Sequence, residues 1–100
     1  MNIGQVIKDF RKQKGIKQGE FAELCQVSQT YLSLIENNQK EPNLSLLKTI
    51  AEQLEIPLPI LFFLSLDEKD VPEQKKDIFK ILEPSLKGLI AQIYIDDPKS

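Results

Sequence analysis

Polar side chains gather on one face of a short predicted helix in the first half of the chain. They carry amides or hydroxyls, and they are Gln29, Thr30, Ser33 and Asn37. At about 100° per residue these positions fall within about a quarter of a turn, opposite the apolar Leu32 and Ile35. Amides and hydroxyls match the donors and acceptors on base edges in the major groove of DNA. We therefore expect this helix to contact bases; the alternative is an ordinary solvated helix face.

Three helices must hold that face in place. Apolar residues at helical spacing predict a first helix that begins near Ile3, with Asn2 as its N-cap and Gly15 as its stop. A second helix is expected over about residues 18–25. Ser28 precedes the third helix, which carries the polar face, and a serine hydroxyl is a preferred N-cap. The pattern predicts two short amphipathic helices joined by a tight turn.

Two further helices complete a first domain, predicted over residues 1–66. Asn43 is the expected N-cap of the fourth, whose apolar residues, Leu44 included, face inward. The fifth is short, and Pro57 and Pro59 fall in its first turn, where a missing N–H group is tolerated. No strand pattern appears. The sequence predicts an all-α fold: a five-helix bundle with one or two additional C-terminal helices.

An acidic, proline-containing linker is predicted at 67–72, and a C-terminal helical segment follows at 73–100. Pro84 removes a hydrogen bond from a helix interior, so we expect two helices there, about 73–83 and 84–95. Their apolar stripe, spaced three and four apart, comprises Ile78, Leu82, Leu86, Leu89, Ile90 and Ile93. This stripe either folds back on the first domain or pairs with a second copy. We favour a homodimer, because two-fold pairing doubles the contacts available on a palindromic site.

The composition argues against several other classes of protein. The chain has no His and one cysteine, Cys25, so it lacks the residues for a zinc site or an internal disulfide. It has no glycine-rich phosphate loop. The longest apolar run, Ile60 to Leu64, is far short of the roughly 18 residues of a membrane span. We expect no catalytic activity, no metal, no cofactor and no membrane contact, and a cytoplasmic location.

Charge is unevenly distributed along the chain. The net charge is −2, but residues 1–48 carry seven basic and five acidic residues (+2), and residues 49–100 carry six and ten (−4). An acidic protein lacks the usual basic footprint of a nucleic-acid binder. Any contact with phosphate is therefore expected in the first half, and the acidic remainder should limit non-specific binding to DNA.

Several stretches within about the first 60 residues follow one known pattern in unbroken register. They are Ile3-Gly-Gln-x-Ile-Lys, Arg11-Lys-x-Lys-Gly15, Gln18-x-Glu-Phe-Ala22, Val27-Ser-Gln-Thr-Tyr-Leu-Ser-x-Ile-Glu36, Glu41-Pro-Asn-Leu and Ile50-Ala. Here the chain resembles the lambda-repressor-like (XRE-type) helix-turn-helix family. The resemblance implies a sequence-specific DNA-binding transcriptional regulator, a repressor by preference, that acts as a homodimer on a palindromic operator. An antitoxin-like or co-regulatory module, which binds proteins with the same helical domain, is the alternative.

The resemblance also implies roles for single residues. The polar face of the third helix matches the base-reading positions of the family. Gln18 matches the start of the second helix, where backbone N–H groups face phosphate, and Lys17 and Lys40 are further candidates for phosphate contact or ordinary surface lysines. Arg11 and Glu36 match positions that resemble a semi-buried ion pair between the first and third helices.

Three departures from the family pattern weaken the motif locally. Lys17 stands where a capping Ser or Thr is usual, and a lysine cannot cap an N-terminus. Gly19 is a poor helix former inside the second helix. Gln26 replaces the usual turn glycine, so a left-handed conformation is expected there, at a cost of ~1 kcal/mol.

Overall fold

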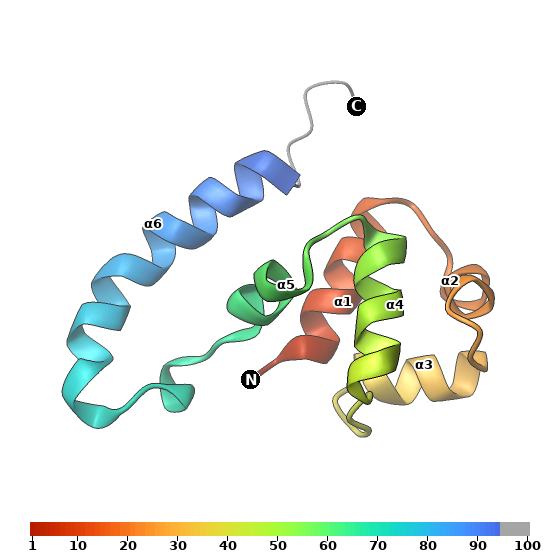
Figure 1. Ribbon diagram of the computed structural model, residues 1–100, viewed down its shortest axis with the longest axis horizontal. Helices are drawn as coiled ribbons and strands as arrows, with labels where there is room; N and C mark the ends of the chain where they lie inside the picture. The colour runs from red at the N-terminus through yellow and green to blue at the C-terminus, as the bar shows by residue number, and fades with distance from the viewer. Residues whose placement is uncertain (95–100) are drawn as a thin grey trace.

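The chain is helical through most of the part that the computed structural model describes, residues 1–94, which contains no strand. The bundle consists of α1 (Ile3–Gln13), α2 (Gln18–Leu24), α3 (Gln29–Glu36), α4 (Leu44–Leu54) and α5 (Leu58–Ser65). Two 3-10 turns, η1 (Glu68–Asp70) and η2 (Glu73–Lys75), lead to α6 (Lys76–Tyr94). The prediction of an all-α fold, with a five-helix bundle and an additional C-terminal helix, is confirmed (Figure 1).

Side-chain caps begin two of these helices where the sequence predicts them. Ser28 Oγ accepts a hydrogen bond from the backbone N–H of Tyr31 at 3.0 Å, which starts α3. Asn43 Oδ1 accepts from the N–H of Leu46 at 2.8 Å, which starts α4. Each cap satisfies an N–H group that the helix itself cannot pair. The first residue of the polar face is therefore placed by its own local sequence.

The start of α1 differs from the prediction, because its cap comes from a distant loop. Asn2 makes no side-chain cap. Instead, Asn38 Oδ1 accepts from the N–H of Gly4 at 3.1 Å, and Asn38 Nδ2 donates to Asn2 Oδ1 at 2.6 Å. A Cβ added to Gly4 would overlap the backbone carbonyl oxygen of Ile35. The first turn of α1 thus docks directly on the end of α3.

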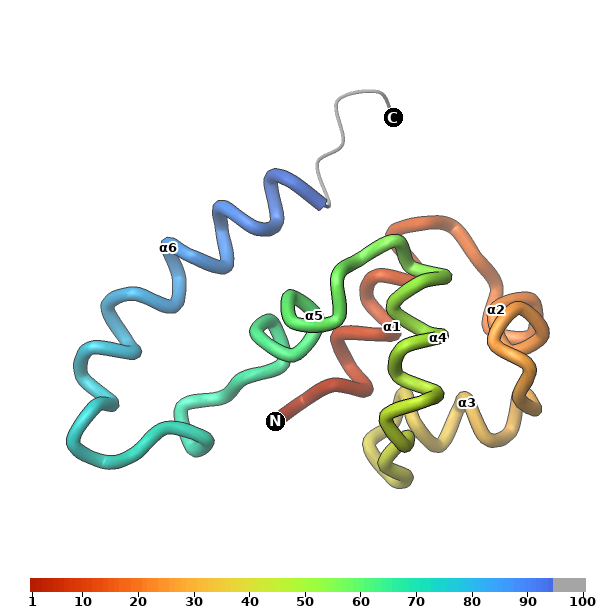
Figure 2. Tube along the Cα trace, viewed as in Figure 1, coloured from red at the N-terminus to blue at the C-terminus, as the bar shows by residue number. Residues whose placement is uncertain are grey.

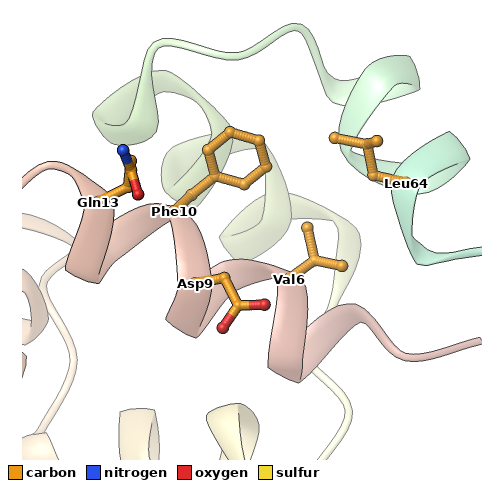
Figure 3. A pocket seen from close by; sticks show the side chains of 5 residues that line it. All are labelled: Val6, Asp9, Phe10, Gln13 and Leu64. Atoms are coloured by element: carbon orange, nitrogen blue, oxygen red, sulfur yellow. The ribbon is translucent and has the colours of Figure 1, made fainter. Parts of the chain in front are cut away.

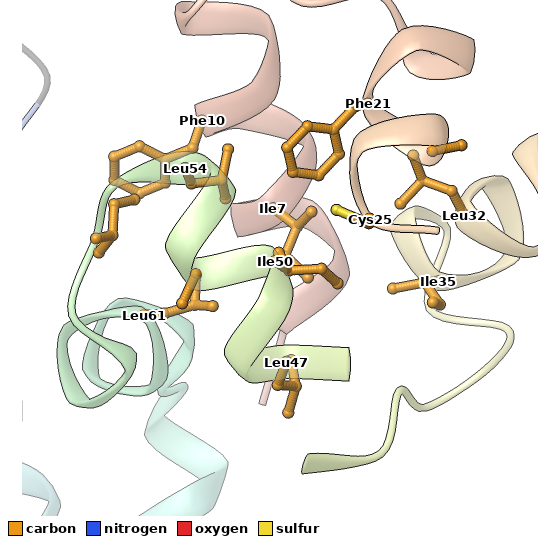
Figure 4. Close-up of a cluster of buried hydrophobic side chains, with 13 residues drawn as sticks. Ile7, Phe10, Phe21, Cys25, Leu32, Ile35, Leu47, Ile50, Leu54 and Leu61 are labelled. Atoms are coloured by element: carbon orange, nitrogen blue, oxygen red, sulfur yellow. The ribbon is translucent and has the colours of Figure 1, made fainter. Parts of the chain in front are cut away.

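The apolar faces of α1–α5 meet in one core (Figure 4). Its most buried large apolar side chains are Ile7, Phe21, Leu32, Ile35, Ile50, Leu54 and Leu61. Leu32 and Ile35 are 0% and 1% exposed, so they anchor α3 from the side opposite its polar face. The inward orientation predicted for Leu44 is wrong, because its side chain is 55% exposed. Leu44 is the first residue of α4, and the first buried residue of that helix is Leu47, one helical turn later.

α6 is one helix, and the prediction of two helices over 73–83 and 84–95 is wrong. Pro84 lies inside it. Proline lacks the N–H that would bond to the carbonyl of the residue four earlier, Lys80. That residue lies on an exposed part of the helix, where water can satisfy its carbonyl. The missing bond is therefore tolerated without ending the helix.

α6 lies apart from α2 and α3 in the views of Figures 1 and 2. Contacts from the middle and the last turn of the helix attach it to the rest of the chain. Lys87 Nζ donates to the carbonyl oxygen of Leu66 at 2.9 Å, and Tyr94 packs against the core. Residues 95–100, the end of the predicted C-terminal segment, lie outside the described residues.

A small pocket opens between α1 and α5 (Figure 3). It is lined by Val6, Asp9, Phe10, Gln13 and Leu64, and its volume is about 200 Å³. Ligand pockets usually measure about 300–1,000 Å³, so this pocket is small for an effector site. Across residues 1–94, no helix combines the length and apolar character needed to cross a membrane. The same residues hold no cluster of His, Cys, Asp and Glu suited to a metal ion.

Candidate nucleic-acid interface

The predicted reading residues lie on the outward face of α3. Gln29, Thr30 and Asn37 are exposed and Ser33 is half-buried. Gln18, at the start of α2, completes a shallow depression with Gln29, Thr30 and Ser33. Asn37 lies one turn beyond Ser33, and its Nδ2 donates to Ser33 Oγ at 3.5 Å. The structure thus brings the amides and hydroxyls together on one open surface.

A buried ion pair holds α3 against α1. Arg11 Nε donates to Glu36 Oε2 at 2.7 Å, and its second terminal nitrogen donates to Glu36 Oε1 at 3.0 Å. The remaining guanidinium nitrogen donates to the carbonyl oxygen of Ile16 at 2.7 Å. Arg11 is 6% exposed and Glu36 2%. A two-point contact between planar groups fixes orientation as well as distance, so the pair sets the angle of α3 relative to α1.

Two glutamines extend this ion pair to the outer surface. Gln18 Nε2 donates to Glu36 Oε1 at 3.0 Å, and Gln29 Nε2 donates to Gln18 Oε1 at 3.3 Å. The chain of contacts runs from Arg11 in the interior to Gln29 on the exposed face. Gln18 therefore does more than begin α2: it orients the amide of Gln29, the first residue of α3.

The two candidate lysines precede α2 and follow α3 along the chain. Lys17 is the N-cap residue of α2, and its side chain makes no cap, as predicted. Lys40 lies in the loop after α3. Both side chains are exposed, and neither has a carboxylate within 4.0 Å among residues 1–94. Their ammonium groups are therefore available for contact with an anion.

Two residues that position the interface were missed by sequence reasoning. Asn38 adopts a left-handed conformation (φ 58°) and ties the loop after α3 to the start of α1. Gly4 allows α1 to approach α3 closely. The Asn-Asn pair at 37–38 indicates a helix end. The contact of Asn38 with Gly4 joins residues that are 34 positions apart, so no local sequence pattern predicts it.

Gln26 adopts the predicted left-handed conformation in the turn between α2 and α3, with φ 61°. Replacing it with glycine should raise the free energy of unfolding by about 1 kcal/mol, because glycine has no Cβ to be strained there. Urea denaturation measures the change. Asn38→Gly is the matched control, since φ there is 58° but the side chain makes two hydrogen bonds. A gain in Asn38→Gly alone would contradict the argument.

Cys25 is buried at the end of α2, and burial raises the pKa of its thiol to about 11. The thiolate is the reactive form, and a free cysteine has a pKa of about 8.5. We expect a thiol reagent at pH 8 to leave the native protein almost unmodified and to label one thiol after denaturation. Free cysteine at the same pH is the control. Rapid labelling of the native protein would show that the α2–α3 turn opens readily.

α2 packs on α3 through the turn at residues 25–28, and α3 packs on α1, which is the geometry of a helix-turn-helix DNA-binding domain. The helix-turn-helix family model matches residues 7–61, more than half of the chain. The chain therefore belongs to this family.

Relatives support the same assignment. The immunity repressor of Bacillus phage phi105 is 32% identical over 97 residues, covering 85% of this chain and 67% of the repressor. A crystal structure of SinR, described as the master regulator for biofilm formation, in complex with DNA matches 60% of this chain and 97% of its own, with 38% identity and a TM-score of 0.57. The complex of SinR with SinI matches 83% of this chain and 80% of its own, with 32% identity and a TM-score of 0.57.

The chain spans 61% to 67% of the length of the first curated relatives that it matches. These relatives are named as a repressor and a transcriptional regulator, not as enzymes.

Proposed function

We propose that the chain is a sequence-specific transcriptional repressor that binds a palindromic operator as a homodimer, in the cytoplasm. The observation that carries this proposal is the exposed polar face of α3, held by a buried ion pair on one side and a hydrogen-bonded glutamine on the other. Reading bases requires side chains whose direction is set before DNA arrives. We assign Gln29 to pair with an adenine, and Thr30, Ser33 and Asn37 to contact neighbouring bases or phosphate.

Backbone contacts are assigned to Lys17, Gln18 and Lys40, which surround the reading face. These three residues lie within residues 1–48, which carry a net charge of +2, whereas residues 49–100 carry a net charge of −4. Figure 1 draws the linker at 67–72, which holds Asp67, Glu68 and Asp70, away from α3. This separation supports DNA binding through the polar face of α3, with the acidic linker kept clear of the phosphates.

Dimerisation is assigned to the outer face of α6. Its large apolar side chains are between 43% and 73% exposed, and they are Ile78, Ile81, Leu82, Leu86, Leu89 and Ile93. A stripe of this size is uncommon on a monomer and is typical of an interface. The adjoining face of α6, with Phe79, Ile90 and Tyr94, is half-buried, so Ile90 does not belong to the exposed part of the predicted stripe. The fold-back alternative therefore leaves the stripe uncovered, and pairing with a second copy covers it.

Selection of genome fragments by the purified chain, followed by sequencing, tests the proposal. We expect a short palindromic motif, with half-sites about one helical turn apart. Sedimentation at micromolar concentration should give a dimer. Enrichment of no motif would refute sequence-specific binding, and a monomer that binds a single half-site would refute the dimer.

A second candidate function is a module that binds another protein, and the same α6 stripe favours it. The complex of SinR with SinI matches most of this chain, so a protein partner is consistent with this architecture. The two functions differ in their dependence on salt. Nanomolar binding to an operator that weakens steeply with salt supports the repressor. Tight, salt-insensitive capture of one protein with no affinity for DNA supports the module.

Lys40→Ala should weaken binding to all DNA sequences alike and reduce the slope of log K against log salt by about 1, because one phosphate contact is lost. Fluorescence anisotropy over a range of salt concentrations measures the slope. Lys69→Ala is the matched control, since Lys69 is an exposed lysine on η1, away from α3. An unchanged slope for Lys40→Ala would remove Lys40 from the interface.

A further inference from the structure

Gly19 lies at a point where α2 and α3 almost touch. It is the second residue of α2, and it faces the side chain of Gln29, the first residue of α3. A Cβ added at Gly19 would lie 3.0 Å from Gln29 Oε1 and 3.5 Å from Gln29 Cδ. Apart from its own helix and its chain neighbours, nothing else described lies within 4 Å. The space that the missing side chain leaves is occupied by one residue only, Gln29.

That space decides where the Gln29 amide points. Gln29 Nε2 donates to Gln18 Oε1 at 3.3 Å, which is already long for an N–H···O hydrogen bond. Gln18 cannot move with it, because Gln18 Nε2 is held at 3.0 Å by the buried carboxylate of Glu36. A methyl group at position 19 must therefore push the amide of Gln29 off Gln18 by a few tenths of an ångström or into another rotamer.

The geometry points to Gly19 as a specificity-determining position: its lack of a side chain holds the Gln29 amide against Gln18 and so sets the base that Gln29 prefers. This inference rests on the proposed function, since it requires Gln29 to read a base. Glycine is a poor helix former, and Gly19 has no positive φ that would require glycine there. Its presence in α2 is explained by the contact with Gln29 instead.

The inference predicts that stability and specificity change in opposite directions in Gly19→Ala. Alanine is the better helix former, and the atom that it would meet is the tip of a flexible side chain, so Tm should rise by a few degrees. The preference for the base pair that Gln29 reads should fall by about fivefold or more. A bidentate contact needs both the carbonyl oxygen and the NH2 group of the amide in place. A purely structural glycine would not alter one base pair selectively.

The experiment compares the wild-type chain with Gly19→Ala, Gln29→Ala and the double variant. Each protein is used to select binding sites from random DNA sequences. The Tm of each is measured by thermal denaturation. Gln29→Ala should lose the preference at one base pair, and adding Gly19→Ala to it should change the motif no further. Gly88→Ala is the matched control: it is also a glycine within a helix, and a Cβ there meets nothing within 4 Å. It should raise Tm and leave the motif unchanged.

Each other outcome has one meaning. A wild-type chain that selects no motif refutes the proposed function itself. A motif that Gln29→Ala leaves intact removes Gln29 as the reader, and the role of Gly19 with it. A motif that changes in Gln29→Ala but not in Gly19→Ala overturns the inference alone. Uniformly weaker binding of Gly19→Ala, with the same motif, would show that the glycine admits the DNA backbone rather than aiming Gln29.

Discussion

Glu36→Ala should lower the free energy of unfolding by about 3–5 kcal/mol, because it leaves the charge of Arg11 buried without its partner. Arg11 is 6% exposed, so water cannot easily replace the lost carboxylate. Gln18 Nε2 loses its acceptor at the same time. Domains of this size are stable by only about 5–15 kcal/mol, so the variant should be marginal at room temperature. Urea denaturation followed by circular dichroism measures the loss.

Two comparisons separate a buried charge from a generally weakened fold. Lys14→Ala breaks an exposed ion pair, Lys14 Nζ to Glu55 Oε1 at 2.9 Å, and should cost less than about 1 kcal/mol. Arg11→Met combined with Glu36→Leu removes both charges and should recover much of the loss. If Glu36→Ala costs no more than Lys14→Ala, the ion pair does not hold α3 in place.

The features that the sequence predicts correctly depend on neighbours along the chain. Ser28 and Asn43 cap helices through bonds to residues three positions later. The polar face of α3 follows from helical periodicity, and the left-handed turn from the identity of residue 26. Each of these depends on at most a few consecutive residues, and short-range geometry is enough to place them.

The features that sequence reasoning missed depend on contacts between distant segments or on exposure. Asn38 caps α1 only because the loop after α3 folds against it. The path from Gln29 to Glu36 passes through Gln18, on another helix. Pro84 stays inside α6 because the carbonyl that it leaves unpaired belongs to an exposed part of the helix. Local patterns carry no information on which helix ends meet, or on which carbonyl groups face water.

Gly4→Ala should lower the free energy of unfolding by about 2 kcal/mol, because the added Cβ would overlap the backbone carbonyl oxygen of Ile35 and lie 2.7 Å from Asn38 Oδ1. Backbone cannot rotate away as a side-chain tip can, so α1 must move off the end of α3. For a domain of about 100 residues, this loss corresponds to a Tm lower by about 8–16 °C. Thermal denaturation measures it.

The same substitution at three glycines tests this explanation, because their surroundings differ in one respect. The Cβ would meet backbone at Gly4, a flexible side-chain tip at Gly19 and open space at Gly88. Helix propensity favours alanine at all three, so the size of the steric penalty decides the sign of the net change in stability. Tm should fall for Gly4→Ala and rise for the other two. A stabilised Gly4→Ala would mean that α1 does not dock on α3 as closely as described, and the cap from Asn38 would then lose its geometric basis.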